Sequence, residues 1–80
     1  MSDADLSAQM LAALKACANE SAGADAPLVS VTMEFIRDED RAEVSASVTR
    51  KTRTLVFVAA EARTGDAIVA TASSVHKIRS

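Results

Sequence analysis

The chain has 80 residues, a formal net charge of -2 and 49% hydrophobic residues, which suits one small domain. So small a net charge gives no support for binding nucleic acid or an anionic membrane surface. Phe35 and Phe57 are the only aromatic residues, so a platform for stacking bases is not expected. Cys17 and His76 are the only residues of their types, which excludes an intrachain disulfide and a structural zinc site.

From the sequence we expect neither a targeting signal nor a membrane-spanning segment. No apolar stretch approaches the roughly 20 residues of a membrane span, and the first five residues are acidic rather than basic. With a single unpaired cysteine, we expect a cytoplasmic protein that does not bind a membrane. A domain of this size buries only about 60% of its unfolded surface, so oligomerisation is expected to stabilise it.

Residues 3–22 are predicted to form an amphipathic helix. Gly23 is expected to end it, and Pro27 favours an extended conformation in the residue before it. The stripe that recurs every 3.6 residues consists of Leu6, Met10, Ala13, Leu14, Cys17 and Ser21, widened by Leu11 and Ala18. We expect this stripe, with Cys17 as a buried core residue, to pack on one face of a sheet.

Four strands are predicted after the helix. Their expected ranges are residues 28–36, 41–50, 53–63 and 67–78. The first two alternate apolar and polar residues, whereas residues 55–60 are continuously apolar, as in a central strand covered on both faces. The residues facing the helix are expected among Val29, Val31, Phe35, Val44, Phe57 and Val69. The fold class is therefore α+β, a helix on a four-stranded antiparallel sheet, and periodicity leaves the orders 2-3-4-1 and 1-2-3-4 open.

Three segments together resemble a known family. They are residues 28–37 (LVSVTMEFIR), residues 46–54 (ASVTRKTRT) and residues 65–72 (GDAIVATA). In order and spacing they resemble the hotdog-fold acyl-CoA thioesterases of the phenylacetyl-CoA type, over roughly residues 7–78 of this chain. The resemblance implies a single hotdog-like domain over residues 1–80 with strand order 2-3-4-1. It also implies a coenzyme A thioester as ligand and a homodimer in which strand 28–36 pairs with its symmetry mate.

The same resemblance implies where catalytic groups should lie. In that family the helix begins with a His-Gly-Gly-type turn, and a catalytic carboxylate follows one or two turns later. The corresponding positions here hold Ser7-Ala8-Gln9 and Lys15-Ala16. Asp3 and Asp5 lie too early and Glu20 too late to replace the carboxylate. We therefore expect no catalytic residue, no cofactor and weak or no hydrolysis. We also expect the chain to lack the N-terminal strand region that precedes the helix in complete hotdog domains.

Three basic residues are the candidate ligand-binding residues. Arg50, Lys51 and Arg53 lie on one predicted turn, and the resemblance suggests that they contact the phosphates of coenzyme A. The alternative is a turn that carries charge because it faces water.

Other chemically capable residues are given structural roles. Cys17 lies far inside the helix, away from the helix terminus that would activate a thiol. His76 stands alone on the last strand, and we expect it to face solvent or an interface rather than to act as a general base. Residues 38–40 (Asp-Glu-Asp) lack the alternating spacing of a calcium loop and are expected to form a solvated connection. Gly23 and Gly65, the only glycines, cannot make a phosphate-cradling loop.

The sequence leaves three functions open. The first is an acyl-CoA thioesterase. The second is a non-catalytic hotdog domain that binds a coenzyme A-like ligand or a protein partner. The third is an unrelated α+β interaction module, which a simple meander of strands would support.

Overall fold

The computed structural model describes residues 3–23, 25–37 and 42–78. These residues form the helix α1 (Asp3–Ala22) and the strands β1 (Leu28–Phe35), β2 (Glu43–Lys51), β3 (Leu55–Thr64) and β4 (Ala67–Lys77). Each strand begins and ends within two residues of its predicted limits. The acidic connection at residues 38–40 lies outside the described residues, so its predicted role is not tested.

The end of α1 is fixed by its own backbone and by a distant lysine. Gly23 has a φ of 71°, the left-handed conformation that glycine adopts without a steric penalty, and its N–H donates to the carbonyl of Asn19 over 2.9 Å. Lys51 Nζ donates to the carbonyl of Ser21 over 2.6 Å. A lysine in this position satisfies an otherwise unpaired carbonyl and opposes the negative end of the helix dipole.

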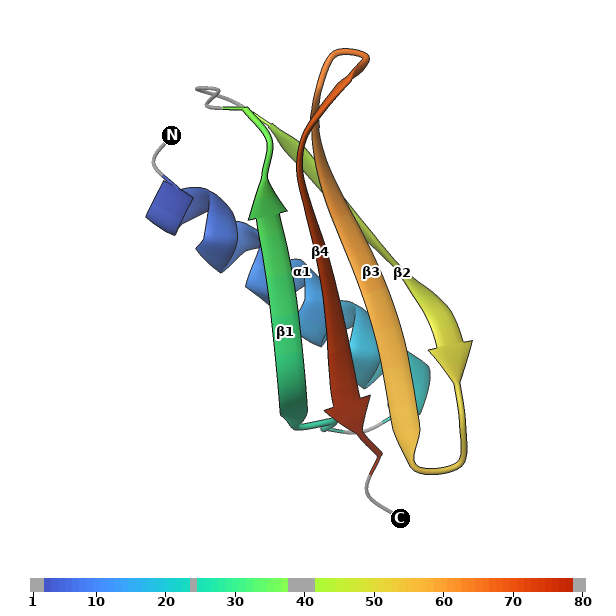
Figure 1. Ribbon diagram of the computed structural model, residues 1–80. Coiled ribbons are helices and arrows are strands. Elements are labelled where there is room, and N and C mark those ends of the chain that lie inside the picture. The colour runs from blue at the N-terminus through green and yellow to red at the C-terminus, as the bar shows by residue number, and fades with distance from the viewer. Residues whose placement is uncertain (1–2, 24, 38–41, 79–80) are drawn as a thin grey trace.

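The strands pair in the order β1-β4-β3-β2, all antiparallel (Figure 1). This order confirms the predicted 2-3-4-1 arrangement and overturns the simple meander. β3 and β4 are central and are joined at a tight turn where Gly65 has a φ of 61°. β1 and β2 are the two edges of the sheet.

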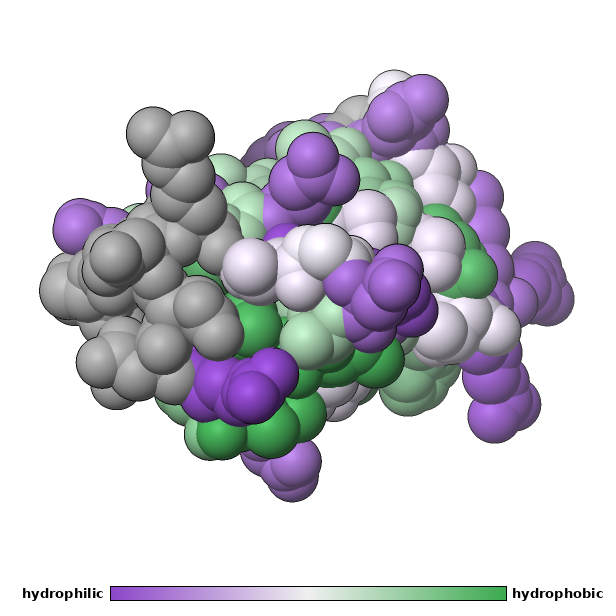
Figure 2. All heavy atoms as spheres, turned by 90° about the horizontal axis from the view of Figure 1, so that it is seen from above, coloured by the Kyte–Doolittle hydropathy of each residue, from purple (hydrophilic) through white to green (hydrophobic). Residues whose placement is uncertain are grey.

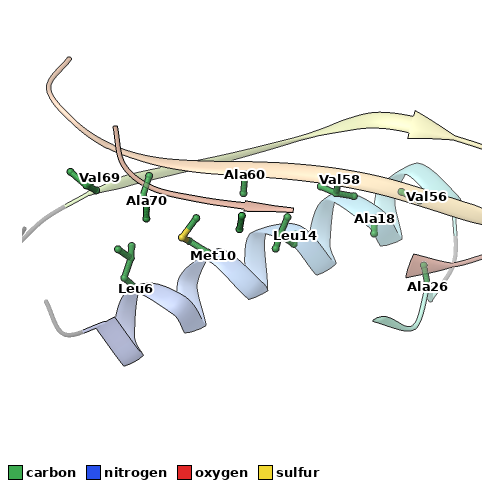
Figure 3. Packing of buried hydrophobic residues seen from close by; sticks show 12 residues of the cluster. Leu6, Met10, Leu14, Ala18, Ala26, Val56, Val58, Ala60, Val69 and Ala70 are labelled. Carbon is green, nitrogen blue, oxygen red and sulfur yellow. The ribbon is translucent and has the colours of Figure 1, made fainter. Parts of the chain in front are cut away.

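The core lies between α1 and one face of the sheet. Leu6, Met10, Leu14 and Ala18 point from the helix toward β3 and β4 (Figure 3). The sheet contributes Val56, Val58, Ala60, Ala62, Val69, Ala70 and Ala72. The expectation for Cys17 was wrong, because its side chain is only half-buried at the edge of this core. Leu6, Met10, Leu14 and Ala18 are spaced four residues apart and form the row of side chains that packs on the sheet. Cys17 directly precedes Ala18 in the sequence, so its side chain lies beside that row.

The helix leaves part of the sheet uncovered. α1 packs mainly on β2 and β3, with little contact to β1. Val44 and Val69 therefore belong to the core as expected, but Phe57 lies on the opposite face of the sheet. The expectation for β1 was wrong as well: Val31 and Phe35 remain 39% and 41% exposed, and Val29 remains 59% exposed.

Candidate functional site

The predicted ligand-binding cations gather at one corner of the sheet, where β2 turns into β3. They do not share one face. Arg50 is paired with Phe57 and lies on the open face, the face opposite α1, with its guanidinium carbon 5.8 Å from the ring centroid. Lys51 is paired with Val56 and lies on the helix side, where it already bonds to Ser21. Arg53 is exposed in the turn itself, so Lys51 is the one of the three cations that is bonded to α1.

The open face carries a hollow that was not predicted from the sequence. Its volume is about 350 Å³, and its lining residues are Ser45, Ser47, Ala59, Ala60, Glu61, Thr71 and Ala72. A smaller hollow of about 170 Å³ adjoins it over Thr32, Glu34, Thr71, Ala72 and Ser73. The available signal was the serine and threonine at every second position, Ser45 and Ser47 in β2 and Thr71 and Ser73 in β4, with Ala59 of β3 between them. Such side chains leave space above a sheet and present hydroxyl groups that both donate and accept hydrogen bonds.

One ion pair borders this hollow. Arg63 Nε lies 2.8 Å from Glu61 Oε1, and both side chains are partly exposed. An exposed pair of this kind contributes at most about 1 kcal/mol to stability, and its carboxylate remains accessible to a second cation.

His76 is fully buried, so the expectation of a solvent-facing or interface histidine was wrong. Its ring Nε2 lies 2.7 Å from Ser74 Oγ, and Nδ1 lies 3.3 Å from the carbonyl oxygen of Ala26. In the arrangement that satisfies all three groups, Nδ1–H donates to the carbonyl and Nε2 accepts from the hydroxyl. The sequence could not reveal this, because strand parity alone decides that His76 points toward the helix.

Ser74 and His76 are hydrogen-bonded in the way a nucleophile and its general base are, but neither side chain is accessible to a substrate. Ser74 is 3% exposed and His76 is 0% exposed, both on the side covered by α1. The pair therefore connects β4 to the segment between α1 and β1. That segment is also held by the Ala26 N–H, which donates to Asn19 Oδ1 over 2.8 Å.

The helix offers no carboxylate near the middle of its length. Asp5 and Glu20 flank a stretch without acids, and both side chains are exposed. Lys15 and Ala16, the positions that match the family's carboxylate, are exposed as well. Within the described ranges, no three metal-ligating side chains come together, and α1 is not long and apolar enough to cross a membrane.

Solved structures of thioesterases have the same fold. The X-ray structure of a protein from the thioesterase superfamily superposes on 99% of this chain with a TM-score of 0.84 and 15% identity. A putative thioesterase from Ralstonia eutropha JMP134, described as related to phenylacetic acid degradation, superposes on 70% with a TM-score of 0.63 and 22% identity. This chain spans 62% and 44% of those two chains, respectively. Identities this low establish the fold alone.

Sequence comparison supplies the family. No curated protein matches the chain significantly. The family described as the acyl-CoA thioesterase N-terminal domain matches residues 6–76, from Leu6 in α1 to His76 in β4. That match covers the whole helix–sheet unit, so the chain belongs to the acyl-CoA thioesterase N-terminal domain family.

Proposed function

We propose that this chain is a thioesterase-like hotdog domain that binds an acyl-CoA-type ligand and hydrolyses it weakly or not at all. One observation carries the proposal: the family match includes all of α1 after Asp5, yet no acid occurs between Asp5 and Glu20. General acid–base assistance is worth about 10²–10⁴-fold in rate. A domain that lacks the group on its helix can keep the ligand-binding surface and lose most of the turnover.

Two surfaces support the ligand class. Arg50 and Arg53 can offer guanidinium groups to the phosphates of coenzyme A, since Arg presents paired N–H donors that match phosphate oxygens. Val31, Met33 and Phe35 form an apolar row on the helix side of β1, in which Val31 and Phe35 are exposed and Met33 packs against the edge of the core. An acyl chain placed along this row would remove apolar surface from water, at about 25 cal/mol per Å².

Ligand binding and turnover can be measured separately on the same protein. We expect thermal stabilisation by acyl-CoA and by free coenzyme A, with thiol release close to the uncatalysed rate for a panel of acyl-CoA substrates. A ligand at 100 times its Kd stabilises the folded state by about 2.7 kcal/mol. Arg50→Ala with Arg53→Ala should lower that shift, whereas Arg63→Ala, at the opposite end of β3, should not.

Two outcomes would contradict the proposal. Fast hydrolysis that survives Asp5→Ala and Glu20→Ala would show a catalytic group elsewhere. The absence of any shift with both ligands would remove the ligand class.

A second candidate role, homo-oligomeric interaction, is favoured by the exposed edge of β1. Leu28, Val29, Val31 and Phe35 are exposed there, as is Ile36 directly after the strand. Seen from above, the surface of the molecule shows hydrophobic residues between hydrophilic ones (Figure 2). Glu34 is the single charge on β1, whereas β2 carries Glu43, Arg50 and Lys51. Charges protect sheet edges against unwanted pairing, so the sparsely charged β1 is the edge suited to pairing with a second copy.

The hydrogen-bond pattern of β1 gives a sharp test of this dimer. The N–H of Ile36 donates to Val69 on β4, so by alternation the N–H groups of Val31 and Phe35 point away from the sheet. Val31→Pro therefore removes an outward donor and leaves the bonds to β4 intact. We expect light scattering to show loss of the dimer, with circular dichroism confirming the fold. Val48→Pro on β2 is the matched control. A dimer that survives Val31→Pro but is lost in Val48→Pro would place the interface elsewhere.

A further inference from the structure

The open face of the sheet carries an apolar patch at the end where β2 turns into β3. Phe57 and Val75 are paired across β3 and β4, and Leu55 lies two residues from Phe57 on the same face. We call these three residues the apolar patch; each side chain is half-buried and remains partly in contact with water. Farther along the face lie the small and polar side chains of the hollow, with Glu61 bonded to Arg63. The apolar patch is therefore the part of this face that suits a flat apolar group.

Cations border the apolar patch on both sides. Lys77 is exposed at the end of β4 and is paired with Leu55. Arg50 is paired with Phe57 from the other side, and Arg53 lies in the turn before Leu55. With strands about 4.8 Å apart and about 3.3 Å per residue, the backbones of Lys77 and Arg50 are about 12 Å apart across the patch. An apolar floor thus lies between two positively charged borders.

We infer that Phe57 and Lys77 bind the nucleotide end of the ligand, with adenine on the ring of Phe57 and the 3′-phosphate of the ribose on Lys77. The inference rests on the proposed function and adds two residues to that site, where Arg50 and Arg53 face the remaining phosphates. Coenzyme A carries one flat base, a 3′-phosphate and a 5′-diphosphate on a single ribose, so it matches an apolar floor with cations on two sides. One aromatic ring is too little for a nucleic acid strand but sufficient for one base, since every base has a π-face.

The position of Lys77 is fixed by its backbone. Its N–H donates to the carbonyl of Pro27 over 2.9 Å, and its neighbour His76 is fully buried on the helix side. Because side chains alternate along a strand, the ammonium group of Lys77 is directed to the open face. An ammonium group held at this position can donate charge-assisted hydrogen bonds to a phosphate without reordering of the main chain.

Three ligands that differ by defined groups test the role of Lys77. Coenzyme A, dephospho-coenzyme A, which lacks only the 3′-phosphate, and pantetheine, which lacks the nucleotide, are each titrated into the chain by calorimetry. We expect coenzyme A to bind the wild-type chain about tenfold more tightly than dephospho-coenzyme A, because a hydrogen bond between charged groups is lost with the phosphate. Lys77→Gln should weaken binding of coenzyme A by the same factor and leave that of dephospho-coenzyme A unchanged. Lys77→Arg keeps the charge and should keep the difference.

Phe57→Leu tests the base separately. It keeps an apolar side chain but removes the aromatic face, so it should weaken coenzyme A and dephospho-coenzyme A alike, by about tenfold, and leave pantetheine unchanged. Lys15→Gln on α1 removes the same charge as Lys77→Gln from an exposed position and is the matched control, which should change no affinity. Circular dichroism of each variant confirms that the fold is intact.

The measured affinities separate this inference from the proposed function. Equal binding of coenzyme A and dephospho-coenzyme A by the wild-type chain overturns the role of Lys77 and leaves the proposed ligand class standing. A difference that survives Lys77→Gln also overturns it, because the 3′-phosphate is then bound elsewhere. Affinities that Phe57→Leu leaves unchanged overturn the role of Phe57. Binding of neither coenzyme A nor dephospho-coenzyme A overturns the inference and the proposed function together.

Discussion

At the scale of single residues, Leu14 is the residue whose replacement most directly measures how strongly α1 packs on the sheet. Its side chain is fully buried between Met10 and Ala18 in the row of side chains that packs on the sheet. Leu14→Ala should lower the free energy of unfolding by about 2–5 kcal/mol, because it removes buried methyl groups and leaves a cavity. Urea titration measures the loss, and the exposed neighbour Lys15→Ala should cost less than about 0.5 kcal/mol. A loss that small for Leu14→Ala would mean that the helix does not cover the core.

The buried pair Ser74 and His76 makes a different prediction. Ser74→Ala should cost about 1–3 kcal/mol, because it leaves Nε2 of the buried imidazole without a partner. His76→Phe combined with Ser74→Ala should cost less than the sum of the two single changes, since the orphaned nitrogen is gone. A double-mutant cycle of unfolding free energies gives the coupling. Strict additivity would show that the 2.7 Å contact contributes nothing to stability.

At the scale of elements, the end of α1 depends on a backbone conformation. A Cβ added at Gly23 would meet no atom within 4 Å, so any cost of Gly23→Ala comes from its φ of 71° alone. We expect a loss of about 1–2 kcal/mol in unfolding free energy. Gly23→Asn should lose less, because asparagine tolerates the left-handed region better than alanine. Equal losses for both substitutions would point to a cause other than backbone conformation.

The elements themselves could be predicted from the sequence, because their signals are local. The 3.6-residue period marks α1, the two-residue alternation marks β1 and β2, and glycine and proline mark the connections. The strand order came from resemblance, since periodicity does not record which strands are neighbours. The order β1-β4-β3-β2 confirms it.

The faces of the strands could not be predicted in the same way. Register shifts between Leu28 and Ser30, between Val48 and Arg50, and between Ala62 and Arg63 change which side later residues occupy. The shift in β2 sends Lys51 to the helix side and divides the basic cluster. The lateral position of α1, which exposes β1 and covers β3, is a property of packing between distant segments and has no local signal.

At the scale of the whole molecule, one helix packs on part of one face of one small sheet. Because a core of this size is marginal alone, association should add measurably to stability. We expect the midpoint of thermal unfolding to rise with protein concentration in the wild-type chain. The rise should diminish in Val31→Pro if the β1 edge is an interface. A midpoint independent of concentration would describe a chain that is stable without partners.

The pairing of β1 with β4 has a consequence for how the chain acquires its structure. β1 is the first strand made and β4 the last, and the hydrogen bond from His76 to Ala26 joins residues 50 positions apart. Contacts this distant in sequence must wait for the closure of a long loop, so folding should be slow for a chain of this length. Until β4 is in place, β1 has no neighbour on either side, and its apolar side chains are available to other unfolded copies. Refolding yield should therefore fall as protein concentration rises, with aggregation competing against completion of the sheet.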